Sequence, residues 1–172
     1  MRNRWVFQRN FRIHITPSST IASQDDLVND LHGIIRIVND KFEGVDVSLE
    51  VEPSTESYYV PGMGWVQTGV TNYRLITRGR DQTATLRALI EALIRIERYA
   101  KRVGLALQPE KLSDIPVEVF SPEIEVKWKE LKGEILAEIP EFEDGSKFLK
   151  EIAAGIAAAV ASAIILKVLG LG

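Results

Sequence analysis

The side chains that most often carry out chemistry are few in this sequence, and they do not form a catalytic pattern. The two histidines, His14 and His32, fall on different predicted elements, so each is better explained as a surface or hydrogen-bonded side chain than as a catalyst or metal ligand. The sequence has no cysteine, which excludes disulfides, thiolate metal sites and cysteine nucleophiles. We therefore expect no catalytic residue and no bound metal.

Two short stretches resemble ligand-binding patterns but lack their essential parts. Gly62-Met63-Gly64 has no third glycine and no following helix, both of which a phosphate-binding loop requires. Four carboxylates flank a predicted linker without the spacing of an EF-hand calcium loop: Glu138, Glu141, Glu143 and Asp144. The Walker A, H-E-x-x-H and G-x-S-x-G motifs are also missing. This pattern favours a non-enzymatic protein without a cofactor.

The composition is that of a folded globular protein of modest size. With 172 residues, 45% hydrophobic and 26% charged, the chain is long enough for one domain and an appendage. The formal net charge of -3 gives no electrostatic reason to expect nucleic acid as a partner. The first residues do not include an apolar signal-peptide segment, so we do not expect secretion by that route.

Hydrophobic periodicity predicts the elements of the first half of the chain. Apolar and polar residues alternate over residues 5–15 and again over 45–52, which indicates two half-buried strands. Between them, Ser23 is a typical helix N-cap before apolar residues at helical spacing, and Gly44 ends that helix. Residues 54–69 follow as a long connection or an extended hairpin.

The second half of the chain continues this order of elements. Residues 70–78 are predicted as a strand, and residues 115–119 as a short last strand. Between these strands, a long helix begins at Asp81 or Thr83 and ends at Gly104. The order strand, helix, strand, strand, helix, strand matches the ferredoxin-like split βαβ sandwich, an antiparallel sheet with helices on one face. We therefore predict an α+β fold of this class, followed by C-terminal helices.

The face of this sheet that lacks helices is the surface that RNA-binding modules of similar arrangement use. Its outward basic positions are predicted at Arg12, His14, Arg74 and Arg78. The usual strand order would place acidic side chains beside them, with Glu50 and Glu52 facing Arg74 and Arg78, and Glu118 near Arg12. Because charges of both signs alternate on this face, it is a poor surface for phosphates, and nucleic acid is not expected as a partner.

Three aromatic residues surround the predicted turn in the connection 54–69: Tyr58, Tyr59 and Trp65. Proline and glycine at residues 61, 62 and 64 mark the turn itself. Aromatic residues at the tip of a hairpin often contact a partner, but they can also fold back as a lid over the sheet. The sequence leaves both interpretations open.

The C-terminal helix is the most unusual predicted element, because residues 152–166 contain no charge. A helix that is apolar on every side must be buried in a membrane, in a core or against copies of itself. Small residues recur at every fourth position and allow two helices to approach closely: Gly155, Ala159 and Ala163. Larger apolar side chains form the adjacent row: Ile152, Ile156, Val160 and Ile164. We expect these two rows to form a helix-packing or assembly site.

Three environments for this helix agree with the sequence. It is predicted as a membrane anchor, which requires the helix to extend to Gly172 with Lys167 reaching the headgroups, as a buried helix between identical subunits, or as a helix within its own domain. Lys147 and Lys150 precede the apolar residues, so an inserted helix would leave the N-terminal domain in the cytoplasm. The partners expected are therefore further copies of the chain and possible lipid contacts through the C-terminal helix.

These observations divide the chain into a sandwich domain (residues 1–121), an amphipathic helix with an acidic linker (122–146) and an apolar, alanine-rich helix (147–172). The sequence favours a non-enzymatic structural or assembly protein, tethered by the last helix to a membrane or to a homo-oligomeric shell, as in a virion or envelope component. The alternative is a soluble module that binds a small ligand or RNA and oligomerises through the same helix.

Overall fold

The computed structural model describes residues 4–21, 23–53, 57–67, 70–116 and 121–139 of the chain. These residues form an α+β fold with a four-stranded sheet, a two-stranded hairpin and three helices. The elements in order are β1 (Trp5–Ile15), α1 (Gln24–Lys41), β2 (Val45–Pro53), β3 (Ser57–Val60), β4 (Gly64–Gln67), β5 (Val70–Gly79), α2 (Gln82–Val103), β6 (Leu105–Gln108) and α3 (Pro122–Glu138).

The four-stranded sheet is antiparallel throughout and has the strand order β2-β5-β1-β6. Strands β1 and β5 form its centre, and they pair over almost their whole length, from Trp5 opposite Gly79 to His14 opposite Val70. The third long strand of the chain therefore lies between the first and the second, as the sequence predicts.

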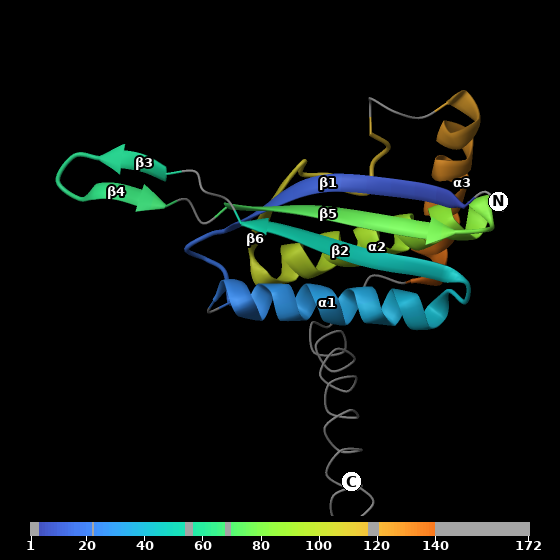
Figure 1. The fold of residues 1–172 in the computed structure, drawn as a ribbon, viewed down its shortest axis with the longest axis horizontal. Coiled ribbons are helices and arrows are strands. Elements are labelled where there is room, and N and C mark those ends of the chain that lie inside the picture. Colours follow the sequence, from blue (N-terminus) through green and yellow to red (C-terminus); the bar gives the residue numbers. More distant parts are fainter. Residues whose placement is uncertain (1–3, 22, 54–56, 68–69, 117–120, 140–172) are drawn as a thin grey trace, which may run out of the picture.

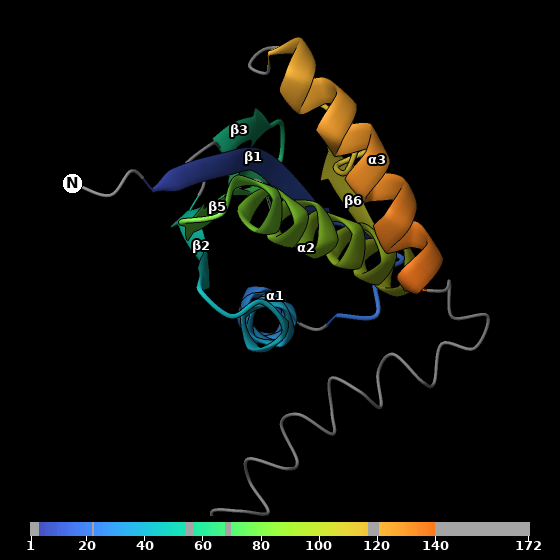
Figure 2. The same ribbon diagram turned by 90° about the vertical axis from the view of Figure 1, so that its right-hand side faces the viewer.

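Helices α1 and α2 cover the same face of this sheet (Figures 1 and 2). The inward side chains of β1 and β5 meet them, and the rings of Phe11 and Tyr73 stack there with centroids 5.4 Å apart. Helix α2 lies at the centre of the core, because side chains on several of its faces are completely buried: Leu86, Leu89, Ile90, Leu93, Ile94 and Ile96. Burial of this apolar surface is the main source of stability for the fold.

The helix ends follow the predicted local signals. The Ser23 hydroxyl accepts a hydrogen bond from the backbone N–H of Asp26, and Asp81 caps α2 in the same way through Ala84. Gly104 ends α2 in the left-handed conformation with φ +77°, where a Cβ would also lie 3.0 Å from the carbonyl oxygen of Ser18. Glycine is therefore required at this position by both conformation and space.

The last strand of the sheet is not where the sequence analysis places it. Strand β6 begins directly after Gly104 and pairs with the end of β1, from Leu105 opposite Ile15 to Gln108 opposite Arg12. The left-handed turn at Gly104 reverses the chain at once, so the alternating residues Leu105 and Leu107 complete the sheet. Ile115 is outside any strand, and residues 117–120 lie outside the described residues.

Helix α3 packs against α2 on the side away from α1 (Figure 2). Its buried side chains recur at helical spacing, as an amphipathic helix requires: Ile124, Trp128, Leu131 and Ile135. Trp128 is 1% exposed, and its indole N–H donates to the carbonyl oxygen of Ser113 at 2.9 Å. This hydrogen bond holds α3 against the segment between β6 and α3. Buried side chains of all three helices belong to one hydrophobic core.

None of the helices in the described part of the chain is long and apolar enough to cross a membrane. Helix α2 is the longest, with 22 residues, but charged side chains recur along it from Arg87 to Arg102. Among the described residues this finding contradicts the prediction of a transmembrane helix, and it leaves the membrane and virion assignments without support. Residues 147–172, for which the prediction was made, lie outside the described residues.

Candidate functional site

The β3–β4 hairpin projects beyond the end of the main sheet (Figure 1). Tyr59 and Trp65 are opposite each other in its register, and their rings make an edge-to-face contact with centroids 5.7 Å apart. Their exposed fractions are 61% and 73%, and Met63 in the turn is 76% exposed. Neither aromatic side chain is folded over the sheet as the lid interpretation requires, and contact with a partner stays a prediction. The side chain of Tyr58 lies outside the described residues.

The hairpin also lacks the features that normally protect exposed strands. Residues 57–67 contain no charged side chain, whereas soluble proteins usually place charges on strands whose edges are open. A two-stranded hairpin is only marginally stable in water unless it packs against another element. Aromatic contact between Tyr59 and Trp65 supplies part of this stability, and the exposed apolar surface is available to a partner.

A second feature is a cleft of about 900 Å³ on the sheet face opposite the helices. All four strands of the main sheet contribute to it, and the polar side chains around it are Asn10, Arg12, Glu50, Glu52, Asn72, Arg74 and Gln108. A cleft of this size is in the range that holds small molecules.

The centre of this cleft is a block of two arginines and two asparagines on β1 and β5. Arg12 Nε donates to Asn72 Oδ1 at 2.7 Å, and Arg74 Nε donates to Asn10 Oδ1 at 3.2 Å. Each arginine is opposite an asparagine in the register, so the two guanidinium groups are diagonal neighbours. Hydrogen bonds through Nε hold both guanidinium groups in place, and a terminal nitrogen of Arg74 also donates to Glu50 Oε2 at 3.3 Å.

The acidic side chains of the open face are only partly where the sequence predicts them. Arg74 contacts Glu50 at 3.3 Å, as expected, but Arg78 lies 3.9 Å from Asp46 and Glu52 is opposite Asn72. The reason is strand direction: β2 and β5 are antiparallel, so a residue further along β5 than Arg74 is opposite a residue before Glu50 on β2. His14 and His32 are both exposed and lie on β1 and α1, and Glu118 lies outside the described residues.

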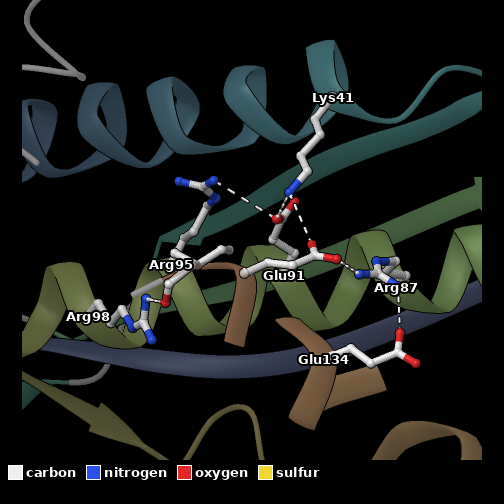
Figure 3. Close-up of polar contacts among 8 residues, drawn as sticks. Lys41, Arg87, Glu91, Arg95, Arg98 and Glu134 are labelled. Carbon is white, nitrogen blue, oxygen red and sulfur yellow. Dashed lines mark hydrogen bonds and ion pairs between the residues drawn. The ribbon is translucent and has the colours of Figure 1, made fainter. Parts of the chain in front are cut away.

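A third feature is an ion-pair network that joins the three helices (Figure 3). Glu91 on α2 is completely buried, and its Oε1 lies 2.5 Å from Lys41 Nζ at the end of α1. On the other side, Arg87 contacts two carboxylates of α3, Glu134 at 2.8 Å and Glu138 at 2.5 Å. Glu138 also lies 3.8 Å from Lys41, so the network is continuous from α1 to α3.

Arg95 lies 3.9 Å from Glu91 Oε1, so three cations face three carboxylates in this network, which indicates a structural role. Burial opposes the charged form of Arg87, but hydrogen bonds to Glu138 and Glu134 outweigh it and raise the pKa of Arg87 above its usual value. Arg98 donates to the carbonyl oxygen of Ile139 at 2.6 Å and so binds the C-terminal end of α3. Together these contacts fix the position at which the chain leaves α3.

The structure tests the predicted site residues unevenly. It places Tyr59 and Trp65 together on one hairpin, but both rows of the C-terminal helix, including Gly155 and Ile152, lie outside the described residues. In the described part of the chain, no group of three or more His, Asp or Glu side chains could hold a metal ion.

The sequence predicts the outward positions of Arg12 and Arg74 but not their pairing with Asn72 and Asn10. A signal was present, because asparagine is unusual within strands and both asparagines occupy outward positions of strands. Comparison with protein-family models, with curated proteins and with solved structures found no match.

Proposed function

We propose that this chain is a non-enzymatic assembly protein whose copies associate through the β3–β4 hairpin. The observation that carries the proposal is the projecting hairpin itself, on which Tyr59, Met63 and Trp65 are exposed beyond the main sheet. Large apolar side chains grouped at the tip of an extended element are typical of a protein contact and are costly to leave in water.

A second copy of the chain is the partner that best fits this hairpin. Residues 57–67 carry no charge, so two hairpins can approach each other without electrostatic repulsion. An open strand edge can pair with the same strand of another copy about a two-fold axis, which satisfies backbone groups of both chains. Such pairing would extend the two-stranded hairpin to four strands and bury both aromatic clusters. The small-residue row at Gly155, Ala159 and Ala163 is proposed as a further contact between copies.

We also propose that the folded body belongs to the ferredoxin-like class. Two features support this: the strand order β2-β5-β1-β6 and the placement of α1 and α2 on one face of the sheet. In this interpretation the β3–β4 hairpin is an insertion between the second and third strands of the common arrangement, and α3 is an addition to it. The body then serves as a rigid base that presents the hairpin.

Self-association is tested by measuring the mass of the full chain with multi-angle light scattering and sedimentation velocity. The double variant Tyr59→Ser/Trp65→Ser should dissociate to a smaller species, because it removes the apolar contact area. Met63→Glu should also favour dissociation, because it would place the glutamates of two copies close together at the contact. The matched control is Val126→Ser, which removes an apolar side chain of α3 that is 56% exposed. If all four proteins have the same mass and the same thermal transition, the hairpin is not a contact between copies.

A second candidate function, binding of a small polar ligand, is supported by the cleft on the open face. It carries charges of both signs, with Glu50 and Glu52 on β2 and Arg74 and Arg12 on the two central strands, and Arg74 pairs with Glu50 at 3.3 Å. This arrangement suits a ligand that carries both a cationic and an anionic group. Thermal-shift measurements with free amino acids as probes test it, and Asn72→Leu should abolish any shift. If no probe raises the transition temperature, the cleft does not bind this class of ligand.

A further inference from the structure

A hollow of about 290 Å³ lies at the end of the sheet far from the hairpin. It is formed where β5 ends, β2 begins and the chain enters β1, so three segments that are distant in sequence meet there (Figure 1). The residues around it are Arg4, Gly44, Val45, Asp46, Arg78, Gly79 and Arg80. Three of these seven residues are arginines.

The charges around this hollow do not cancel, unlike those of the cleft on the open face. Arg78 has two neighbours on β2, with Asp46 at 3.9 Å and the Ser48 hydroxyl at 3.4 Å. Arg4 and Arg80 are exposed, and neither has an ion-pair or hydrogen-bond partner among the described residues. Asp46 is the only carboxylate that lines the hollow among those residues, so the local charge is positive.

Two other carboxylates adjoin the lining residues in the sequence: Glu43, which is exposed and does not line the hollow, and Asp81. Asp81 follows Arg80 directly, but its Oδ1 accepts the backbone N–H of Ala84 at 2.6 Å and caps α2. Gly44 and Gly79 contribute only backbone to the walls, and Gly44 has a positive φ of +79° in the turn before β2. The hollow is therefore a small space lined by the backbone of two glycines and by three arginine residues.

We propose that this hollow binds the phosphoryl group of a small phosphorylated ligand. The planar fork of a guanidinium group matches two oxygens of a phosphate, and arginine is the side chain best suited to such bidentate contacts. Three arginines around one hollow can together neutralise a phosphate dianion, and the single carboxylate of Asp46 leaves an excess of positive charge.

A small ligand fits this position better than a nucleic-acid strand. Strands of nucleic acid require a basic surface that continues over several phosphates. Here the basic surface does not continue beyond the hollow, because Glu50 and Glu52 follow along β2 and Glu50 pairs with Arg74. The site is also independent of the hairpin, since it lies at the opposite end of β5.

Isothermal titration calorimetry of the full chain with inorganic phosphate, at constant pH and ionic strength, tests the proposal. The expected result is saturable binding that weakens at least about tenfold in Arg4→Gln/Arg80→Gln, since each arginine contributes charge-assisted hydrogen bonds. Both side chains are exposed, so the double variant should keep its thermal transition. Arg36→Gln, which removes an exposed arginine of α1, is the matched control and should bind phosphate as the unmodified chain does.

Two further measurements define the ligand class. Asp46→Asn should tighten phosphate binding, because it removes the one carboxylate that lines the hollow. Glycerol phosphate should bind at least as tightly as inorganic phosphate, whereas a single-stranded oligonucleotide should bind no more tightly. The proposal is overturned if phosphate does not bind, if the double variant and Arg36→Gln behave alike, or if the oligonucleotide is the preferred ligand.

Discussion

Lys41 Nζ, in the last turn of α1, lies 2.5 Å from Oε1 of Glu91, a carboxylate that is completely buried in the middle of α2. The second oxygen of Glu91 is also buried and has no hydrogen-bond partner among the described residues. Arg95 approaches Oε1 from the next turn at 3.9 Å. The charge of Glu91 is therefore compensated mainly through one lysine, whose own side chain reaches solvent.

We expect Lys41→Met to destabilise the protein more than an ordinary surface substitution does. Removing one partner of a buried ion pair leaves an uncompensated charge and costs on the order of 3 kcal/mol, although solvent near Lys41 reduces this amount. Denaturant unfolding followed by circular dichroism measures the change in the free energy of unfolding.

The double variant Lys41→Met/Glu91→Gln is the companion measurement. It should recover much of the stability lost in Lys41→Met, because no buried charge remains without a partner. Equal stability of Lys41→Met and the unmodified chain would show that Glu91 is neutralised by some other group.

The second prediction concerns where the chain can be shortened. A protein that ends at Glu143 keeps α3 and should show one cooperative thermal transition, since the described core is complete at Ile139. A protein that ends at Phe120 loses Trp128, and with it the other buried side chains of α3.

The shorter protein should be strongly destabilised, because each large apolar side chain contributes about 1.5–3 kcal/mol when it is buried. Differential scanning calorimetry distinguishes the outcomes. If both shortened proteins melt alike, α3 contributes nothing to the core, and a single shared core for α1, α2 and α3 is excluded.

The third prediction is an alkaline loss of stability through Tyr99. Burial and a hydrogen bond to Asp30 (Oη to Oδ2 2.5 Å) raise the pKa of Tyr99 well above its usual value of about 10. Because the folded-state pKa is the higher one, this stabilisation is complete below about pH 10 and is lost as the pH rises through the folded-state pKa.

Tyr99→Phe should remove part of this pH dependence while lowering the stability at neutral pH. Urea unfolding at a series of alkaline pH values measures how steeply the free energy of unfolding falls with pH. Burial also raises the pKa of Tyr73, so Tyr73→Phe is the control that separates the two tyrosines. An unchanged slope in Tyr99→Phe would assign the alkaline transition to another group.

The fourth prediction tests the small-residue row of the C-terminal segment. If copies of the chain pack through Gly155, Ala159 and Ala163, Ala159→Leu should weaken self-association by separating the helices. Ala158→Leu is the control, because it lies about 100° around a helix from Ala159 and off the row.

Light scattering and thermal melts of the full chain measure both effects. Assembly of Ala159→Leu that equals that of the unmodified chain would remove the row as an interface. Destabilisation without any change in mass would instead indicate a helix packed within its own domain, where overpacking costs about 1–3 kcal/mol.

Local signals in the sequence determined most of the elements. Alternation placed β1 and β2, and Ser23, Asp81 and Gly104 marked helix ends that the structure confirms, because capping depends only on neighbouring residues. The burial of Trp128 on α3 was likewise predictable, since a helical period places one face toward a core.

Pairing across distant segments was decided only by the tertiary structure. Strand β6 (Leu105–Gln108) has only four residues, too few for a periodic pattern to identify it from the sequence. It is a strand because it pairs with β1. Register also placed Arg78 beside Asp46 rather than beside the predicted partner Glu52. In sequence terms Glu91 is one of many charged helix residues, and only the packing of α1 and α3 around α2 buries it against Lys41. Burial and opposition of side chains are long-range properties, so they become fixed only when the elements pack together.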